Sequence, residues 1–320
     1  MKSEIVLVTG GSGFLGVHTL LQLLQLGYTV RTTVRSLQKK EQIIDALGVG
    51  GITDVSGLSF YEADLTSDKG WKEVIMGCQY VLHLASPFPA SEPKDEMELI
   101  VPARDGALRV LKSSIQAGIK RVVLTSSFAA VGYSPKSDSH IFTEKDWTNP
   151  EDVGQAYIRS KIIAERAAWD FMKTAGGRTE LTVINPVGIF GPIIGNISSA
   201  SIDVVIKGIL KGDIEESPSF SLGVVDVRDV ADLHIKAMVA KDAANERFIA
   251  TADQIVSFYD IAQILKKERP YQSYNIKNMK PTSEQFYKSI SNKKAVTNLQ
   301  WKPRSTKEAI LASVDSVLYN

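Results

Sequence analysis

The sequence has few of the features that mark specialised protein classes. Its single cysteine, Cys78, cannot form an internal disulfide, which we expect of a protein in a reducing compartment such as the cytoplasm. The four histidines, at positions 18, 83, 140 and 234, share no metal-ligand spacing, so we expect no metal site. No run of eighteen apolar residues occurs, and the segment before Ile5 is too short for a signal-peptide core. We therefore expect no membrane contact and a cytoplasmic location.

The chain also lacks a surplus of charge of either sign. Thirty-seven basic and 36 acidic residues leave a net charge of +1, which favours neither nucleic acid nor an anionic membrane as a partner. The four tryptophans are scattered along the 320 residues and form no stacking platform for bases. Hydrophobic residues make up 44% of the chain and charged residues 23%, as in ordinary globular proteins. We expect a globular monomer or homodimer whose partner is a small molecule.

What the sequence does have is a regular alternation of short β-rich runs and longer helical stretches over residues 1–185, which predicts an α/β domain with a doubly wound parallel sheet. The predicted strands are Ile5 to Thr9, Tyr28 to Val34, Leu58 to Ala63, Tyr80 to Ala85, Arg121 to Ser126 and Leu181 to Asn185. The clearest predicted helices are Phe14 to Leu26, Asp105 to Ala117 and Gln155 to Thr174. Gly27 and Gly118 directly follow the first two, and Gly176 and Gly177 close the third.

The pattern changes after Pro186, where glycine and proline become frequent. We interpret residues 186–320 as mainly a smaller substrate-binding region. Within it, segments near 227–251 are predicted to return to the first domain, as a helix over Val227 to Ala240 and a strand over Phe248 to Thr251. The Lys- and Ser-rich tail, residues 282–320, is predicted to be helical and exposed.

A glycine-rich turn separates the first predicted strand from the first predicted helix. Its glycines satisfy the spacing G-x-x-G-x-x-G, which permits a tight turn and a close approach of the backbone to a pyrophosphate at the helix N-terminus. The residues predicted to hold a dinucleotide there are Gly10, Gly11, Ser12, Gly13, Phe14, Leu15 and Gly16.

The end of the second predicted strand favours NADP (NADPH) over NAD. An acidic residue at this point would bind the ribose 2′-hydroxyl, whereas an arginine suits a 2′-phosphate. The sequence here has no acid and two arginines, Arg31 and Arg35. Arg35 is the preferred phosphate ligand because its guanidinium can form two parallel hydrogen bonds, with Lys39 and Lys40 as possible additions.

A tyrosine and a lysine, Tyr157 and Lys161, occur four residues apart on one face of a predicted helix. A nearby ammonium is expected to lower the tyrosine pKa, so that the phenol can protonate the oxygen that forms when a carbonyl accepts a hydride. The fifth predicted strand ends in Ser126 and Ser127, at the sheet edge where such folds bind ligands. One of these hydroxyls is expected to hold the carbonyl oxygen.

Several motifs, in the right order, resemble the extended short-chain dehydrogenase/reductases. Besides the glycine turn they are Asp64-Leu65, Ala85-Ser86-Pro87, Thr125-Ser126-Ser127, Tyr157 to Lys161 and Asn185-Pro186-Val187. Over nearly the whole chain, the sequence is similar to the group of dihydroflavonol reductases, cinnamoyl-CoA reductases and yeast or bacterial aldehyde/ketone reductases. The resemblance implies a Rossmann fold with Ser127, Tyr157 and Lys161 as the catalytic set, the lysine also binding the nicotinamide ribose.

The same resemblance implies further contacts with the cofactor and a structural role for one later segment. It places Asp64 and Leu65 beside the adenine, Ala85 on the path to the nicotinamide, and Pro186 and Val187 at the nicotinamide end. Asp226 to Ala231 is interpreted as a structural anchor of the substrate region.

Two departures from the plant enzymes narrow the expected substrate. Flavonoid reductases of this group carry asparagine where this chain has Gly132, and cinnamoyl-CoA reductases carry a cysteine-containing signature that Gly154 to Arg159 lacks. An NADPH-dependent reductase of small aldehydes or ketones is therefore the leading hypothesis. Residues proposed for an apolar pocket wall are Phe88, Val187, Phe190, Ile194 and Phe220.

Two other functions stay open. A sugar-nucleotide epimerase or dehydratase would use the same tyrosine with retained NAD, although Arg35 argues against NAD and Phe128-Ala129 lacks the acidic pair of a 4,6-dehydratase. A non-catalytic redox sensor that binds NADP is the alternative from another class, although the tyrosine and lysine are retained.

Overall fold

The computed structural model describes residues 4–87, 93–175 and 177–318. Its centre is a seven-stranded sheet with the order β10-β7-β5-β4-β1-β2-β3, in which every neighbouring pair is parallel. The strands are β1 (Ile5–Thr9), β2 (Thr29–Val34), β3 (Leu58–Glu62), β4 (Tyr80–His83), β5 (Arg121–Thr125), β7 (Glu180–Pro186) and β10 (Arg247–Ala250). This arrangement confirms the Rossmann-type α/β fold, with the reversal of strand order between β1 and β4.

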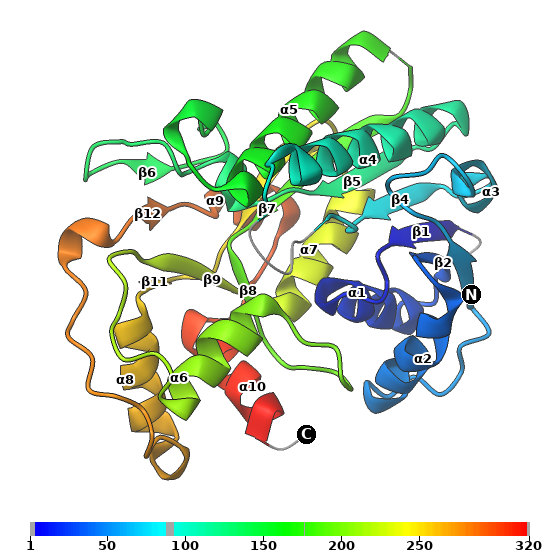
Figure 1. The fold of residues 1–320 in the computed structure, drawn as a ribbon. Coiled ribbons are helices and arrows are strands. Elements are labelled where there is room, and N and C mark those ends of the chain that lie inside the picture. Colours follow the sequence, from blue (N-terminus) through cyan, green and yellow to red (C-terminus); the bar gives the residue numbers. More distant parts are fainter. Residues whose placement is uncertain (1–3, 88–92, 176, 319–320) are drawn as a thin grey trace.

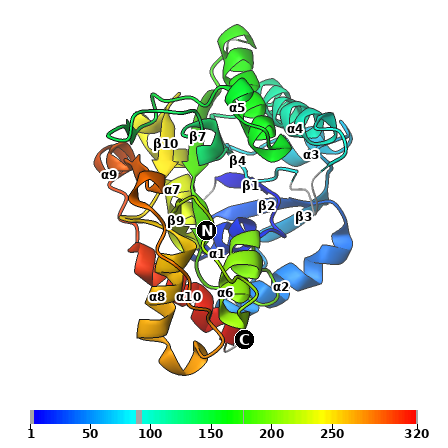
Figure 2. The same ribbon diagram turned by 60° about the vertical axis from the view of Figure 1, so that its left-hand side comes forward.

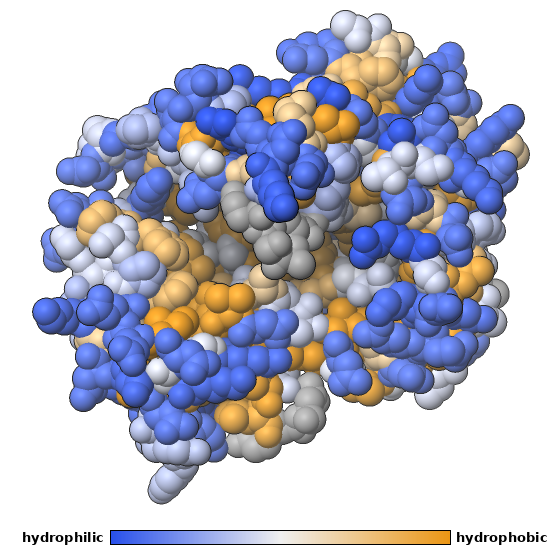
Figure 3. All heavy atoms as spheres, in the orientation of Figure 1, coloured by the Kyte–Doolittle hydropathy of each residue, from blue (hydrophilic) through white to orange (hydrophobic). Residues whose placement is uncertain are grey.

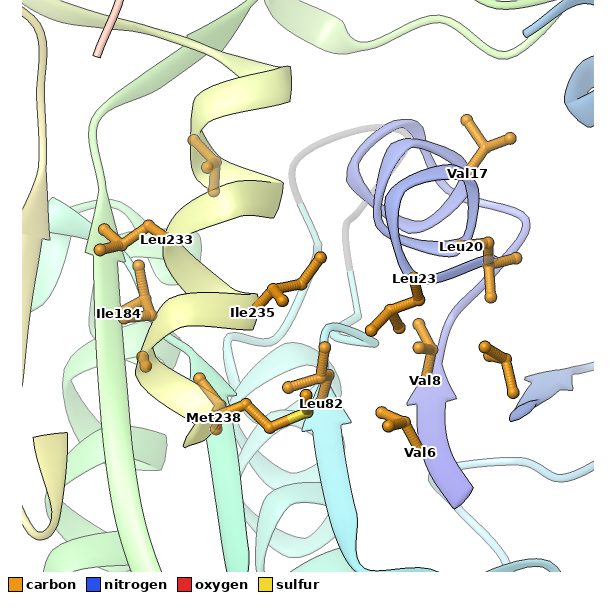
Figure 4. Packing of buried hydrophobic residues seen from close by; sticks show 14 of the residues in the cluster. Val6, Val8, Val17, Leu20, Leu23, Leu82, Ile184, Leu233, Ile235 and Met238 are labelled. Atoms are coloured by element: carbon orange, nitrogen blue, oxygen red, sulfur yellow. The ribbon is translucent and has the colours of Figure 1, made fainter. Parts of the chain in front are cut away.

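Helices cover both faces of this sheet (Figure 1). One face carries α1 (Phe14–Gln25), α2 (Lys40–Val49) and α7 (Val227–Val239); the other carries α3 (Trp71–Ile75), α4 (Met97–Gln116) and α5 (Ala156–Ala175). Figure 4 shows Leu20 and Leu23 of α1 and Met238 of α7 meeting strand residues such as Val8 in the first of these layers. The central strands, such as β4 and β10, are buried on both sides, which explains their short runs of apolar residues, whereas the edge strand β3 is partly exposed.

A smaller layer lies beyond the carboxyl ends of the strands (Figure 2). It has a three-stranded sheet, β8 (Gly188–Phe190), β9 (Leu222–Asp226) and β11 (Ile255–Val256), with the order β11-β9-β8. A π-helical turn (Ser201–Ile206) leads into α6 (Lys207–Lys211), and α8 (Phe258–Glu268) and α10 (Thr306–Leu318) complete a separate apolar core. The pair β6 (Ile141–Phe142) and β12 (Ser289–Ile290) and the helix α9 (Lys293–Leu299) connect this layer to the main sheet. Figure 3, in the orientation of Figure 1, shows a hollow near the middle of the molecule, with apolar side chains along its lower border.

In the segment predicted to return to the first domain, residues 227–251, α7 packs on the main sheet and β10 pairs with β7. The prediction of an exposed tail is wrong. Trp301 is fully buried and its indole N–H donates to the carbonyl oxygen of Asp229 at 2.9 Å. Ile310 and Val314 of α10 are also fully buried, because apolar residues spaced along α10 form a stripe that the many lysines and serines obscured in the sequence.

Helix α4 begins at Met97, eight residues before its predicted start at Asp105. Pro102 lies inside this helix, and proline is normally a sign of a helix end. Leu99 and Ile100 are buried in the first turns, and their burial outweighs the local preference. Among the described residues, no helix is long and apolar enough to cross a membrane.

Candidate active site

The glycine turn between β1 and α1 is tightly packed and leaves the helix start open. A Cβ on Gly16 would lie 2.2 Å from the carbonyl oxygen of Gly10, and a Cβ on Gly11 would lie 2.1 Å from Oγ1 of Thr32. The helix begins at Phe14, and its N-cap residue, Gly13, provides no side-chain hydrogen bond. Backbone N–H groups of the first turn therefore face outward as donors for an anion such as a pyrophosphate.

The two arginines of β2 and its end have different surroundings. Arg31 donates from Nη1 to the carbonyl oxygens of Val74 at 2.9 Å and Met76 at 2.8 Å, so it has a structural role. Arg35 is exposed and has no hydrogen bond or ion pair with any residue that the structure describes. Lys39 is also exposed and donates to Oε1 of Gln42 at 3.2 Å. Arg35 is thus the arginine available for a phosphate.

Three further residues assigned to the cofactor, Asp64, Leu65 and Ala85, lie just after the ends of β3 and β4. Hydrogen bonds from Thr66 lower the pKa of Asp64, and the positive charge of Arg35 adds to this effect, which places Arg35 near Asp64. Leu65 packs against α4, where a Cβ on Gly106 would lie 2.9 Å from it. The backbone N–H of Ala85 donates to Oγ1 of Thr9 at 3.0 Å, and its Cα lies 3.0 Å from where a Cβ on Gly10 would be.

Three side chains, from the end of β5 and from α5, form the centre of the site. Tyr157 forms a side-chain hydrogen bond with Ser127. Lys161, one turn further along α5, has its Nζ 5.5 Å from the centroid of the Tyr157 ring and donates to Oγ of Ser86 at 2.7 Å. Because Ser86 follows Ala85, a continuous series of contacts joins the glycine turn to the tyrosine.

The tyrosine pKa differs from the sequence expectation of a lowered value. Burial raises the pKa of Tyr157 to about 12, repulsion from Tyr133 in its ionised form adds to the rise, and the hydrogen bond with Ser127 opposes it. Burial also lowers the pKa of Lys161 to about 8. Burial is the largest cause of the raised tyrosine pKa. The Lys161 ammonium lies over the ring and donates to Ser86, and it does not lower the tyrosine pKa. At neutral pH the phenol keeps its proton and can act as an acid.

Glu165 is a site-positioning residue that the sequence analysis did not identify. This carboxylate is 1% exposed and lies one turn beyond Lys161 on the same face of α5. Its Oε2 accepts from Oγ of Ser126 at 2.5 Å and from Nδ2 of Asn185 at 2.7 Å, and Nδ2 of Asn185 also donates to the carbonyl oxygen of Ser127 at 3.1 Å. Of the two serines, Ser126 is therefore used to hold the strand end, and Ser127 is the one beside Tyr157.

The buried carboxylate of Glu165 has its counter-charge nearby. Nε of Arg247 donates to Oε1 of Glu165 at 2.6 Å, and the guanidinium stacks on Trp147 with its carbon 3.7 Å from the ring centroid. The signal that could have found Glu165 is its spacing, since residues four apart on a helix share a face.

The proposed pocket walls are only partly compatible with the structure. Phe190 is fully buried and Ile194 is 8% exposed, both within the apolar core, so assigning them to an accessible pocket is wrong. Phe190 ends strand β8, and the side chains of both residues pack into the apolar cores. Phe220 is 47% exposed and its ring lies 5.5 Å from that of Phe258. Phe88 lies outside the described residues.

At the carboxyl end of β7, Pro186 is buried and Val187 is partly exposed. The backbone N–H of Val187 donates to the carbonyl oxygen of Ala250 at 3.1 Å, which fixes this end against β10.

The segment from Asp226 to Ala231, interpreted as a structural anchor, is held by ion pairs. Asp226 caps α7 and pairs with Arg228 at 2.6 Å, and the carboxylate of Asp229 binds Arg304.

The buried histidines do not gather into a metal site. Burial lowers the pKa of His83 to about 3, with the nearby charge of Lys161 adding to it, and its Nδ1 lies 2.8 Å from Oγ1 of Thr9. Over the described ranges, no group of three or more possible ligands could hold a metal ion. His83 is thus a neutral packing residue behind the site.

Comparison with known proteins decides the family. A model described as the NAD dependent epimerase/dehydratase family matches residues 6–250. The chain belongs to this family. This assignment confirms the resemblance to extended short-chain dehydrogenase/reductases on which the site residues were assigned.

Relatives within the family include several reductases. The NADPH-dependent methylglyoxal reductase GRE2 of Saccharomyces cerevisiae is 31% identical over 98% of both chains. Cinnamoyl-CoA reductase CAD2 of Medicago truncatula is 33% identical over 83% of this chain and 81% of its own. The crystal structure of the yeast methylglyoxal/isovaleraldehyde reductase Gre2 with NADPH superposes with a TM-score of 0.86, at 29% identity over 98% of both chains.

Proposed function

We propose that this protein is an NADPH-dependent reductase of small aldehydes and ketones, with Tyr157 as the general acid. The observation that carries the proposal is the series of contacts from Gly10 through Ala85 and Ser86 to Lys161 and Tyr157. It joins a nucleotide-binding turn to a phenol that can give up a proton. The similarity to reductases described as NADPH-dependent supports the same reaction class.

The cofactor is NADPH, and the residues present suit it. The uncapped first turn of α1 offers backbone donors to the pyrophosphate. Arg35, which is exposed and forms no hydrogen bond or ion pair with a described residue, suits the 2′-phosphate. Lys39, Asp64 and Leu65 are assigned to the adenosine side. Ala85, Lys161, Pro186 and Val187 are assigned to the nicotinamide side.

When bound, NADPH supplies a hydride to the carbonyl carbon. The hydroxyl of Ser127 donates a hydrogen bond to the carbonyl oxygen, and Tyr157 transfers its proton to this oxygen as negative charge develops there. A tyrosine pKa of about 12 keeps the acid loaded at neutral pH, which favours reduction over alcohol oxidation. The ammonium of Lys161 stabilises the tyrosinate that remains after the transfer.

The direct test is NADPH oxidation with aliphatic, aromatic and α-dicarbonyl substrates by the parent protein and by Tyr157→Phe. We expect turnover by the parent and a loss of 100-fold or more, on the order of the contribution of general acid catalysis, in the variant. Tyr271→Phe is the matched control, because this tyrosine is 89% exposed and lies outside the site. Equal turnover by parent and Tyr157→Phe would refute the mechanism.

The same measurements separate the two alternative functions. A sugar-nucleotide epimerase or dehydratase would be purified with tightly held NAD, which mass spectrometry of the released cofactor detects. A redox sensor would bind NADPH but turn over no carbonyl, and its binding would be the same in Tyr157→Phe.

A further inference from the structure

A cavity of about 850 Å³ lies at the start of the edge strand β10, outside the site described above. Its walls come from the residues after β6, from the second half of α5, from the start of β10 and from α9, which lies beside β10 (Figure 2). None of the described residues assigned to NADPH or to the carbonyl belongs to its lining. The volume suits a small organic molecule.

The lining of this cavity is basic. It carries five basic side chains, Lys145, Lys173, Arg247, Lys293 and Lys294, against two acidic ones. Lys145 and Lys293 are exposed, and their ammonium groups form no ion pair or hydrogen bond within the part of the chain that the structure describes. The charge of the walls therefore favours an anion as the occupant.

The two acidic residues of the lining already have partners. Oε2 of Glu246 forms an ion pair with Nζ of Lys294 at 2.5 Å. Oε1 of Glu144 accepts from the backbone N–H of Ile249 at 3.0 Å. Neither carboxylate is left to neutralise the two free ammonium groups.

Two indole rings, those of Trp147 and Trp169, supply flat apolar surface to the same cavity. Nε1 of Trp169 donates to Oε1 of Glu165 at 3.2 Å. Trp147 lies against the guanidinium of Arg247, whose Nε donates to the same carboxylate oxygen. The buried carboxylate thus holds both rings in place before a ligand arrives, which lowers the entropic cost of binding.

Arg247 also has an unused donor. Its Nη1 donates to the carbonyl oxygens of Glu144 at 2.8 Å and Asp146 at 2.9 Å. Its Nη2 is buried and has no hydrogen-bond partner among the described residues. Buried polar groups are nearly always satisfied, and the positive end of this N–H dipole adds to the preference for an anion.

We propose that this cavity is a second binding site, for a planar aromatic anion whose ring lies against the two indoles and whose charge is met by Lys145 and Lys293. An aliphatic anion would leave the flat indole surface without a matching face, and a neutral aromatic molecule would leave the ammonium groups without a counter-charge. The site uses none of the reaction proposed above, so it stands or falls separately from the reductase function.

The test is calorimetry with three probes that separate charge from aromaticity. They are 2-naphthoate, its neutral amide 2-naphthamide, and the aliphatic anion cyclohexanecarboxylate. The parent protein should bind 2-naphthoate about ten-fold more tightly than either of the other two, as expected for one contact between charged groups or one stacked ring. Saturation with NADP⁺ should leave this affinity unchanged, because the cavity lies outside the cofactor site.

Two double variants place the probe in the cavity. Lys145→Ala/Lys293→Ala should weaken the binding of 2-naphthoate about ten-fold, since each exposed ion pair contributes up to about 1 kcal/mol, and should leave that of 2-naphthamide unchanged. Lys69→Ala/Lys72→Ala changes the net charge equally, at two exposed lysines near the other edge strand, β3, and should have no effect.

Four results would overturn the inference. They are no binding of 2-naphthoate by the parent, equal affinity of the parent and the cavity variant, an equal loss in the control variant, and displacement of the probe by NADP⁺. Because no measurement depends on turnover, a failure of the proposed reductase function would leave the outcome of this test unchanged.

Discussion

Replacing Lys161 with methionine should make the cofactor-free protein more stable while removing its activity. The lysine is 8% exposed, and burial lowers its pKa from 10.5 to about 8. The difference between these values, at 1.36 kcal/mol per pH unit, corresponds to about 3 kcal/mol of destabilisation from the buried charge at pH 7. Methionine removes that charge and keeps most of the volume. It also loses the hydrogen bond from Nζ to Ser86, which is worth about 1 kcal/mol, so a net gain of about 2 kcal/mol is expected.

The pH dependence gives the same prediction a second check. Because the folded-state pKa is lowered, the penalty is fully present below pH 8, decreases between pH 8 and 10.5, and is absent above. Urea denaturation of parent and Lys161→Met should therefore show a difference that shrinks as the pH rises through this window. Lys173→Met, at a highly exposed lysine of the same helix, should change the stability by less than 0.5 kcal/mol, as usual for surface sites. A Lys161→Met protein less stable than the parent at pH 7 would refute the reasoning.

Three further changes test the cofactor site and its support. Arg35→Asp should raise the KM for NADPH about ten- to a hundred-fold, the cost of a lost charged hydrogen bond, with little effect on NADH; equal effects on both cofactors would remove the assignment. Gly16→Ala should abolish NADPH binding measured by fluorescence, because its Cβ would lie 2.2 Å from a backbone oxygen; binding at parental affinity would contradict the crowded turn. Glu165→Gln should destabilise the fold by about 3–5 kcal/mol in urea denaturation, since Arg247 would become an unpaired buried charge; a variant as stable as the parent would show that the pair is dispensable.

The central sheet was predictable because its signals are local. Most strands of the sheet are short runs rich in apolar or β-branched residues, and β1 was predicted with both of its bounds correct. Gly27, with φ +77°, follows α1 as predicted from its position. The alternation of such elements permits few topologies, and the parallel Rossmann sheet is the common one.

The features that were missed depend on long-range contacts. The burial of Trp301 rests on the carbonyl of Asp229, seventy-two residues away, which no local pattern reveals. Helix α4 continues through Pro102 because tertiary packing buries residues of its first turns.

The candidate site was predictable to a similar degree and for similar reasons. Motif order identified the residues that the structure brings together, such as Ser127 and Tyr157. The pKa of Tyr157 was not predictable, because it depends on burial and on Tyr133, twenty-four positions earlier in the chain. The role of Glu165 needs partners from β7, from β10 and from the residue that follows β5. The sequence alone does not place these around one carboxylate.

The most direct test of the proposed chemistry is a crystal structure with NADPH and an unreactive carbonyl analogue. The proposal predicts the hydroxyls of Tyr157 and Ser127 within hydrogen-bond distance of the analogue's carbonyl oxygen, and that carbonyl carbon stacked on the nicotinamide ring. A structure in which the Tyr157 hydroxyl points away from the nicotinamide, out of reach of the carbonyl, would contradict it.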